Sequence, residues 1–164
     1  MNNDVPLDIE KLVFDKIDKG VAGSSLCLEN RKLGDDGVLK LSNLEILSEV
    51  ICLELGENNI SDEGVRTLCN SPYIENLKTL NLKSNNITEL GAKSLANSPK
   101  LKKLEHLILK FNRIGEMGAS YLAQSETLTN LSTLDLFRNR IGDTGVKIIK
   151  KSKIFQGVSR MRLD

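Results

Sequence analysis

Only a few residues of this chain could carry catalytic chemistry. The sequence contains a single histidine, His106, and three cysteines, Cys27, Cys52 and Cys69. A cysteine nucleophile needs a base such as histidine within hydrogen-bond reach. Asp135 could approach His106 if the two residues lie on adjacent strands, but that pair would lack a nucleophile. Whether any of these groups meet depends on the elements that position them.

Those elements follow from a repeat of 27 residues that extends along most of the chain. Leucine, glycine and a second aliphatic residue each recur at this step. The recurring residues are Leu28, Leu55, Leu82, Leu109, Leu136 and Leu163; Gly37, Gly64, Gly91, Gly118 and Gly145; and Leu41, Leu68, Leu95, Leu122 and Ile149. A period of about 20–29 residues with this leucine spacing indicates a solenoid of stacked repeats. A solenoid presents an open surface, and its usual role is to hold another macromolecule.

Each copy of the repeat has the pattern L-x-x-L-x-L-x-x-N-x-I-x-x-x-G-x-x-x-L. Full copies begin at Val50, Leu77, Leu104 and Leu131, an earlier copy covers residues 26–41, and a partial copy covers 158–163. In L-x-L the two leucines face one side of a strand, so stacking joins them into one core. The pattern resembles the leucine-rich repeat family, in the longer strand-plus-helix form of ribonuclease inhibitor, over residues 23–164.

The resemblance implies an α/β fold, a right-handed solenoid with parallel strands on its concave face and helices on its convex face. Six strands are expected, and five helices should begin near residues 35, 62, 89, 116 and 143. The expected strands are Leu26–Leu28, Leu53–Leu55, Leu80–Leu82, Leu107–Leu109, Leu134–Leu136 and Met161–Leu163. Each expected helix has a carboxylate in its first turn, such as Asp62, where a negative charge interacts favourably with the positive end of the helix.

The chain divides into a cap and a repeat domain. Residues 1–22 are expected to form an N-terminal helical cap, and residues 23–164 to form the leucine-rich repeat domain. Within the cap, apolar residues at helical spacing predict an amphipathic helix over residues 4–19, which ends at Gly20. The glycine of each repeat is expected to let the helix and strand layers approach closely, because a Cβ would clash there.

This fold keeps the candidate catalytic groups apart. His106 lies on the fourth expected strand and Cys27 on the first, so about 14 Å separates them. Cys27 and Cys52 lie on neighbouring strands but two residues out of register, about 8 Å apart and beyond disulfide reach. Unpaired thiols favour a reducing compartment. There is no phosphate-binding Gly-rich motif and no metal-spaced cluster, so we expect no enzyme activity, no cofactor and no metal.

One asparagine per repeat follows each strand at the turn. These are Asn58, Asn85, Asn112 and Asn139. Their amides can satisfy backbone groups that lose their partners where the chain bends, so we expect a structural role for them.

The candidate partner-binding residues are outward-facing residues of the third to fifth strands and the residues just beyond. Aromatic side chains and arginine dominate the energetics of many protein interfaces. Phe111 and Phe137 fall there beside Arg138, although either ring could instead fold onto the leucine core. The expected contact residues are Lys83, His106, Ile108, Lys110, Phe111, Asp135, Phe137 and Arg138.

The charge is divided unevenly along the chain. Residues 1–82 have a net charge of −7 and residues 83–164 have a net charge of +8, which gives +1 in total. The division is either drift on a solvated surface or a means of orienting a partner or a second copy. A nucleic-acid binder would be basic overall, so that class is disfavoured. No apolar run is long enough to span a membrane, and the acidic start of the chain is not a signal peptide.

The leading hypothesis is a non-catalytic module that binds a partner protein on its concave sheet face. Short repeat proteins of this composition are similar to bacterial effectors delivered into host cells, so the expected location is the cytoplasm or a host cell reached without a signal peptide. The alternatives are a regulator of an enzyme, of the GTPase-activator or nuclease-inhibitor type, and a unit that assembles with itself. We expect a monomer or a weak, salt-sensitive self-association.

Overall fold

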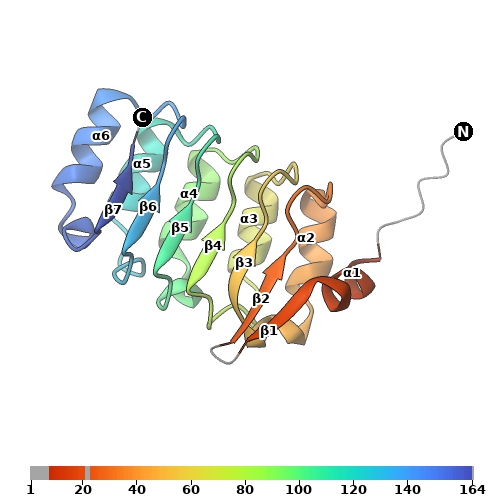
Figure 1. Cartoon of the computed structure of the whole chain (residues 1–164). Helices are drawn as coiled ribbons and strands as arrows, with labels where there is room; N and C mark the ends of the chain where they lie inside the picture. Colours follow the sequence, from red (N-terminus) through yellow and green to blue (C-terminus); the bar gives the residue numbers. More distant parts are fainter. Residues whose placement is uncertain (1–7, 21–22, 164) are drawn as a thin grey trace, which may run out of the picture.

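The computed structural model describes residues 8–20 and 23–163, which form one sheet with a row of helices on one of its faces (Figure 1). The strands are β1 (Ile17–Gly20), β2 (Gly23–Cys27), β3 (Val50–Glu54), β4 (Thr79–Asn81), β5 (His106–Ile108), β6 (Thr133–Asp135) and β7 (Arg160–Arg162). The α-helices are α1 (Ile9–Lys16), α2 (Gly34–Ser42), α3 (Asp62–Cys69), α4 (Glu89–Asn97), α5 (Gly115–Ala123) and α6 (Gly142–Lys151). Short 3-10 helices follow α2, α4 and α6: η1 (Glu45–Glu49), η2 (Pro99–Leu101) and η3 (Lys153–Phe155). Among these elements, no helix is long and apolar enough to cross a membrane.

The sheet confirms the expected solenoid. Its strands lie side by side in chain order, and the pairs from β2 to β7 are parallel. Leu53 pairs with Leu80, which pairs with Leu107, so equivalent leucines of successive repeats lie in one row. The strands begin slightly before the predicted residues, and the helices α2 to α6 begin within one residue of prediction. The leucine rows are fully buried between the sheet and the helices from β2 to β6, whereas Met161 and Leu163 in the last copy are partly buried.

The N-terminal segment differs from the expected helix over residues 4–19. Within the described residues, α1 ends at Lys16, and the chain continues as β1, which pairs antiparallel with β2 from Ile17↔Leu26 to Gly20↔Gly23. The helix prediction was wrong here because the edge of β2 exposes unpaired backbone groups that an added strand can satisfy. Ile9 and Val13 of α1 are buried in the same core as the repeats. Residues 4–7 lie outside the described residues.

The glycine that recurs in each repeat packs against the preceding helix and against its own turn, and not against a strand as expected. A Cβ at Gly64 of α3 would lie 2.4 Å from Oδ1 of Asp35 on α2. A Cβ at Gly118 of α5 would lie 2.4 Å from Cγ2 of Ile114 in its own repeat and 3.2 Å from the Cβ of Ala92 on α4. The glycines therefore leave room for the preceding helix and for the aliphatic residue four positions earlier in the same repeat.

First-turn carboxylates of two helices bond the helix of the following repeat. Asp35 Oδ1 accepts hydrogen bonds from the backbone N–H of Ser61 (2.8 Å) and Gly64 (3.1 Å). Asp62 Oδ1 accepts equivalent bonds from Thr88 (2.7 Å) and Gly91 (2.9 Å). Unpaired N–H groups at a helix start need such acceptors. The first turn of α2 thus helps to hold α3, and the first turn of α3 helps to hold α4.

The asparagine after each strand is buried and bonds backbone groups of two repeats. Asn85 Nδ2 donates to the carbonyls of Leu55 and Leu82, both at 3.0 Å. Its Oδ1 accepts from the N–H groups of Asn58 and Ile60, also at 3.0 Å. An amide in this position leaves few backbone groups of the turn without a partner.

Replacing Leu82 with alanine is expected to lower the free energy of unfolding by about 2–5 kcal/mol, because the layers on both sides line the void. Leu90 is a matched control, since it lies on α4 of the same repeat and is 58% exposed. Leu90→Ala should change the stability by less than about 0.5 kcal/mol. Urea denaturation measures both. Equal stability of the two variants would contradict a continuous leucine core.

Replacing Asn85 with alanine is expected to lower the free energy of unfolding by about 1–3 kcal/mol, because it leaves buried backbone groups unpaired. The neighbouring Asn86 is exposed, so Asn86→Ala provides the control. Chemical denaturation under the same conditions compares them. If Asn85→Ala is as stable as the unmodified chain, the hydrogen bonds of this amide do not support the fold.

Candidate functional site

The groups that could carry catalysis are kept apart in the structure. His106 Nδ1 lies 3.0 Å from Thr133 Oγ1 and 3.3 Å from Ser132 Oγ. Asp135 forms neither a hydrogen bond nor an ion pair with His106. Asp135 pairs in register with Ile108, and its carboxylate accepts a hydrogen bond from the backbone N–H of Phe137 at 3.1 Å.

The three cysteines are free thiols. Ser25 pairs in register with Cys52, so Cys27 and Cys52 are two residues out of register, as predicted. Burial raises the pKa of the Cys69 thiol to about 12. Burial also raises the pKa of Cys52, so neither thiol is activated as a nucleophile. Among the described residues, no group of three or more His, Cys, Asp or Glu could hold a metal ion.

Two phenylalanines and two arginines gather at the ends of β5, β6 and β7. We call Phe111, Phe137, Arg138 and Arg162 the aromatic–arginine cluster. The two rings meet edge to face, with centroids 5.8 Å apart and an angle of 82°. The Arg138 guanidinium lies 5.8 Å from the centroid of Phe111 and 5.6 Å from that of Phe137. Arg162 lies 4.8 Å from Phe137. These distances are in the range of favourable aromatic and cation–π contacts.

The backbone of Phe111 has a left-handed conformation that the repeat imposes. Its φ is 60°, and the equivalent residues Glu57, Ser84 and Arg138 have φ between 54° and 59°. Such a φ costs a residue with a Cβ about 1–2 kcal/mol, which is why glycine and asparagine are preferred. Phe111 is nevertheless a bulky residue and is 43% exposed. Neither the backbone nor the core explains a phenylalanine at this position.

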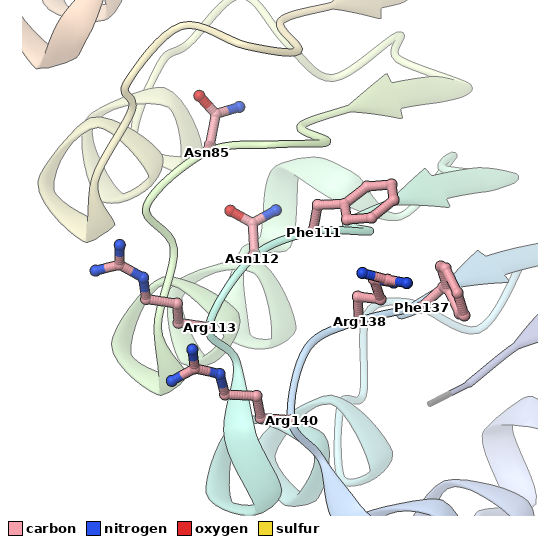
Figure 2. A pocket seen from close by; sticks show the side chains of 7 residues that line it. All are labelled: Asn85, Phe111, Asn112, Arg113, Phe137, Arg138 and Arg140. Atoms are coloured by element: carbon pink, nitrogen blue, oxygen red, sulfur yellow. The ribbon is translucent and has the colours of Figure 1, made fainter.

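A groove of about 650 Å³ runs along the loops that join strands to helices, and three residues of the cluster line part of it. We call it the arginine groove; its lining residues are Asn85, Phe111, Asn112, Arg113, Phe137, Arg138 and Arg140 (Figure 2). Arg113 and Arg140 were not among the predicted site residues. The sequence does contain a signal for these two positions. The residue after the turn asparagine is Asn59 or Asn86 in the earlier copies and arginine in the later ones.

A second hollow, of about 380 Å³, lies on the open face of the sheet, which is the face without helices. Three predicted residues, His106, Ile108 and Asp135, line it with Arg160 and Arg162. Phe111, Phe137 and Arg138 line the arginine groove instead. The predicted residues therefore divide between two adjacent hollows, and Lys83 and Lys110 line neither of them.

Two predicted contact residues, Lys83 and Asp135, form ion pairs within the chain. Lys83 Nζ lies 2.5 Å from a carboxylate oxygen of Glu29 and 3.8 Å from one of Glu57. The hydrogen bond with Glu29 holds the pKa of Lys83 above its ordinary value. Asp135 was expected to be exposed, but only 8% of its surface is accessible. It is covered because its carboxylate turns toward the backbone N–H of Phe137 and lies 3.7 Å from Arg162.

Replacing Phe111 with asparagine should change the free energy of unfolding by less than about 1 kcal/mol. Relief of the left-handed backbone offsets the lost ring contact, which contributes about 0.5–1.5 kcal/mol. Phe155 is the control, because it is 3% exposed and part of the core. Phe155→Ala should cost about 3–5 kcal/mol. Urea denaturation gives both values, and a comparable loss in Phe111→Asn would make Phe111 a structural residue.

Comparison with known families places these loops within recognised repeats. A family model described as Leucine Rich repeat matches residues 50–69, 73–96, 100–123 and 127–149, more than half of the chain. No curated protein matches the chain. Repeats of this family commonly serve as protein-interaction modules and are generally not catalytic. The pattern of the sequence, the parallel sheet with its row of helices and the four matched repeats agree: the chain belongs to the leucine-rich repeat family.

Proposed function

We propose that this chain is a protein-binding module whose partner contacts the ends of β5 and β6. The aromatic–arginine cluster is the observation that carries this proposal. Aromatic and arginine side chains at the centre of an interface typically contribute most of the binding energy. Here Phe111, Phe137 and Arg138 lie on loops and Arg162 lies on β7, all outside the buried leucine core.

The conformational cost of a left-handed backbone at Phe111 supports a role of this residue in binding. A bulky apolar side chain at an exposed, left-handed position does not contribute to the core, and the repeat would accept glycine or asparagine there. Residues that are unfavourable for stability concentrate at functional sites. A partner that covers Phe111 would bury the exposed part of the ring and recover apolar surface from water.

The proposed contact surface extends from the cluster onto the open face of the sheet. Arg162 links the two parts, because it lies beside Phe137 and also lines the sheet-face hollow. His106 and Ile108 are half-buried on this face and available for contact. The proposed contact residues remain Lys83, His106, Ile108, Lys110, Phe111, Asp135, Phe137 and Arg138, with Phe111, Phe137 and Arg138 at the centre. Lys83 and Asp135 would lie at the margin, since each already has a charged partner within the chain.

Rigid geometry favours this surface as a recognition site. The Phe111 N–H donates to the Phe137 carbonyl at 2.9 Å, which joins the two loops that carry the rings. Binding therefore needs little ordering of the backbone. Preformed surfaces lose less conformational entropy on association, so more of the contact energy is available for affinity.

Replacing Phe137 with serine is expected to weaken binding of a partner purified from cell lysate at least tenfold, because a central aromatic anchor contributes about 2 kcal/mol or more. The melting temperature should change little, since Phe137 is outside the leucine core. Titration of the partner by isothermal calorimetry measures the affinity of each variant.

The control for this experiment is Lys151→Glu on α6, on the helical side of the solenoid. It should bind the partner like the unmodified chain. If Lys151→Glu weakens binding while Phe137→Ser does not, the partner contacts the helical side and the proposed site is wrong.

A further inference from the structure

We infer that the arginine groove binds an acidic segment of the partner protein, an inference that rests on the proposed function and adds the chemistry of the bound segment. Carboxylates of the segment would pair with Arg113 and Arg140. An apolar side chain of the same segment would lie on Phe111 and Phe137. The groove thus selects partners that combine acidic residues with an aromatic or large aliphatic residue.

Unpaired positive charge in the groove is the first observation behind this inference. Arg113, Arg138 and Arg140 are all exposed, and none has a carboxylate within ion-pair distance among the described residues. By contrast, Arg66 and Arg162 each have a carboxylate partner. Guanidinium groups form paired, charge-assisted hydrogen bonds with carboxylates. Three such groups around one groove give it a strong preference for anions.

The positions of these arginines indicate where the carboxylates of a bound segment should lie in the groove. Arg113 and Arg140 occupy the same place in consecutive repeats, directly after Asn112 and Asn139. Figure 2 shows these two side chains together at one end of the groove and Arg138 beside the phenylalanine rings at the other. A bound segment can therefore place acidic residues at one end and an apolar residue at the other.

The shape of the groove favours a peptide segment over a small anion. Its volume of about 650 Å³ is large for one phosphate or carboxylate ion. The amides of the lining asparagines are already used inside the chain: Asn112 Nδ2 donates to the carbonyls of Leu82 and Leu109 at 2.9 and 2.8 Å. A single small anion would therefore leave most of the groove empty and find no free side-chain amide to enclose it.

The charge of the adjoining repeats disfavours a nucleic acid strand. Residues 1–82 have a net charge of −7, and the overall charge is only +1. A nucleic acid that extended along the solenoid would bring its phosphates toward this negative half. Affinity for nucleic acid depends on the number of phosphates that basic residues neutralise. A short acidic protein segment avoids this repulsion because it needs only the groove.

The test uses fluorescein-labelled synthetic peptides and fluorescence polarisation with the whole chain. One peptide is Glu-Glu-Glu-Trp-Glu-Glu-Glu, and the other has glutamine in place of every glutamate. The acidic peptide should bind at least tenfold more tightly. Its binding should be lost near 1 M salt, where screening acts over about 3 Å. The double variant Arg113→Gln/Arg140→Gln should lose at least tenfold in affinity for the acidic peptide.

The matched control is Lys147→Gln/Lys151→Gln, which removes the same charge from exposed positions on α6. It should bind the acidic peptide like the unmodified chain, and circular dichroism should show both double variants folded. Equal binding of the two peptides, including no binding of either, overturns the inference. So does equal loss in both double variants, or tighter binding of a labelled oligothymidylate than of the acidic peptide.

A second copy of this chain could also supply the acidic segment, because residues 1–82 are negative. Light scattering distinguishes this self-association from binding of a different protein. A mass that doubles at low salt and returns to the monomer in Arg113→Gln/Arg140→Gln would assign the groove to self-association and overturn the inference. The proposed function is judged separately: if the peptides show no selectivity but Phe137→Ser still releases the partner, the proposed function stands and only the acidic specificity fails.

Discussion

In each of the four full repeats, the side-chain amide of one buried asparagine bonds backbone groups of its own repeat and of the one before. Asn139 donates to the carbonyls of Leu109 and Leu136, both at 2.9 Å, and accepts from the N–H of Ile114 at 3.3 Å. Without such partners the bend after each strand would bury unpaired backbone groups. The repeat can therefore turn sharply from strand to helix, and the leucine rows can stack in register.

This hydrogen-bonded bend also creates the positions that vary in chemistry. At the left-handed position the repeats carry Glu57, Ser84, Phe111 and Arg138, all with nearly the same φ. The N–H groups of Glu57, Ser84 and Phe111 each donate to the following repeat, at 2.9–3.0 Å. The backbone is thus held by bonds that do not depend on the side chain. An acidic, a small polar, an aromatic or a basic residue can occupy the same place, and each changes the surface without changing the fold.

The 27-residue period predicted the structural features that recur in every repeat. It did not predict the features that depend on one particular tertiary contact. Buried leucine rows and helix starts recur every 27 residues, so pattern alone located them. β1 has no equivalent in the repeat, and its strand arises because β2 would otherwise be an open edge. Alternation along a strand placed Asp135 outward, but its carboxylate turns back toward Phe137 N–H. In the candidate site, Phe111, Phe137 and Arg138 were predicted because they come directly after the ends of strands. Arg113 comes after the turn asparagine, where the direction of a side chain depends on how the bend folds and not on strand alternation.

Paired and unpaired charges distinguish the later repeats of this regular solenoid from the earlier ones. In the early repeats, Lys83 lies between Glu29 and Glu57, so the cation there is already neutralised by the chain. Arg113 and Arg140, in later repeats, have no such carboxylate among the described residues. Because each repeat contacts mainly its neighbours, surface charges change one repeat at a time with little effect on the rest. A binding site can then develop on two repeats, while the others supply the length of core that keeps those two rigid.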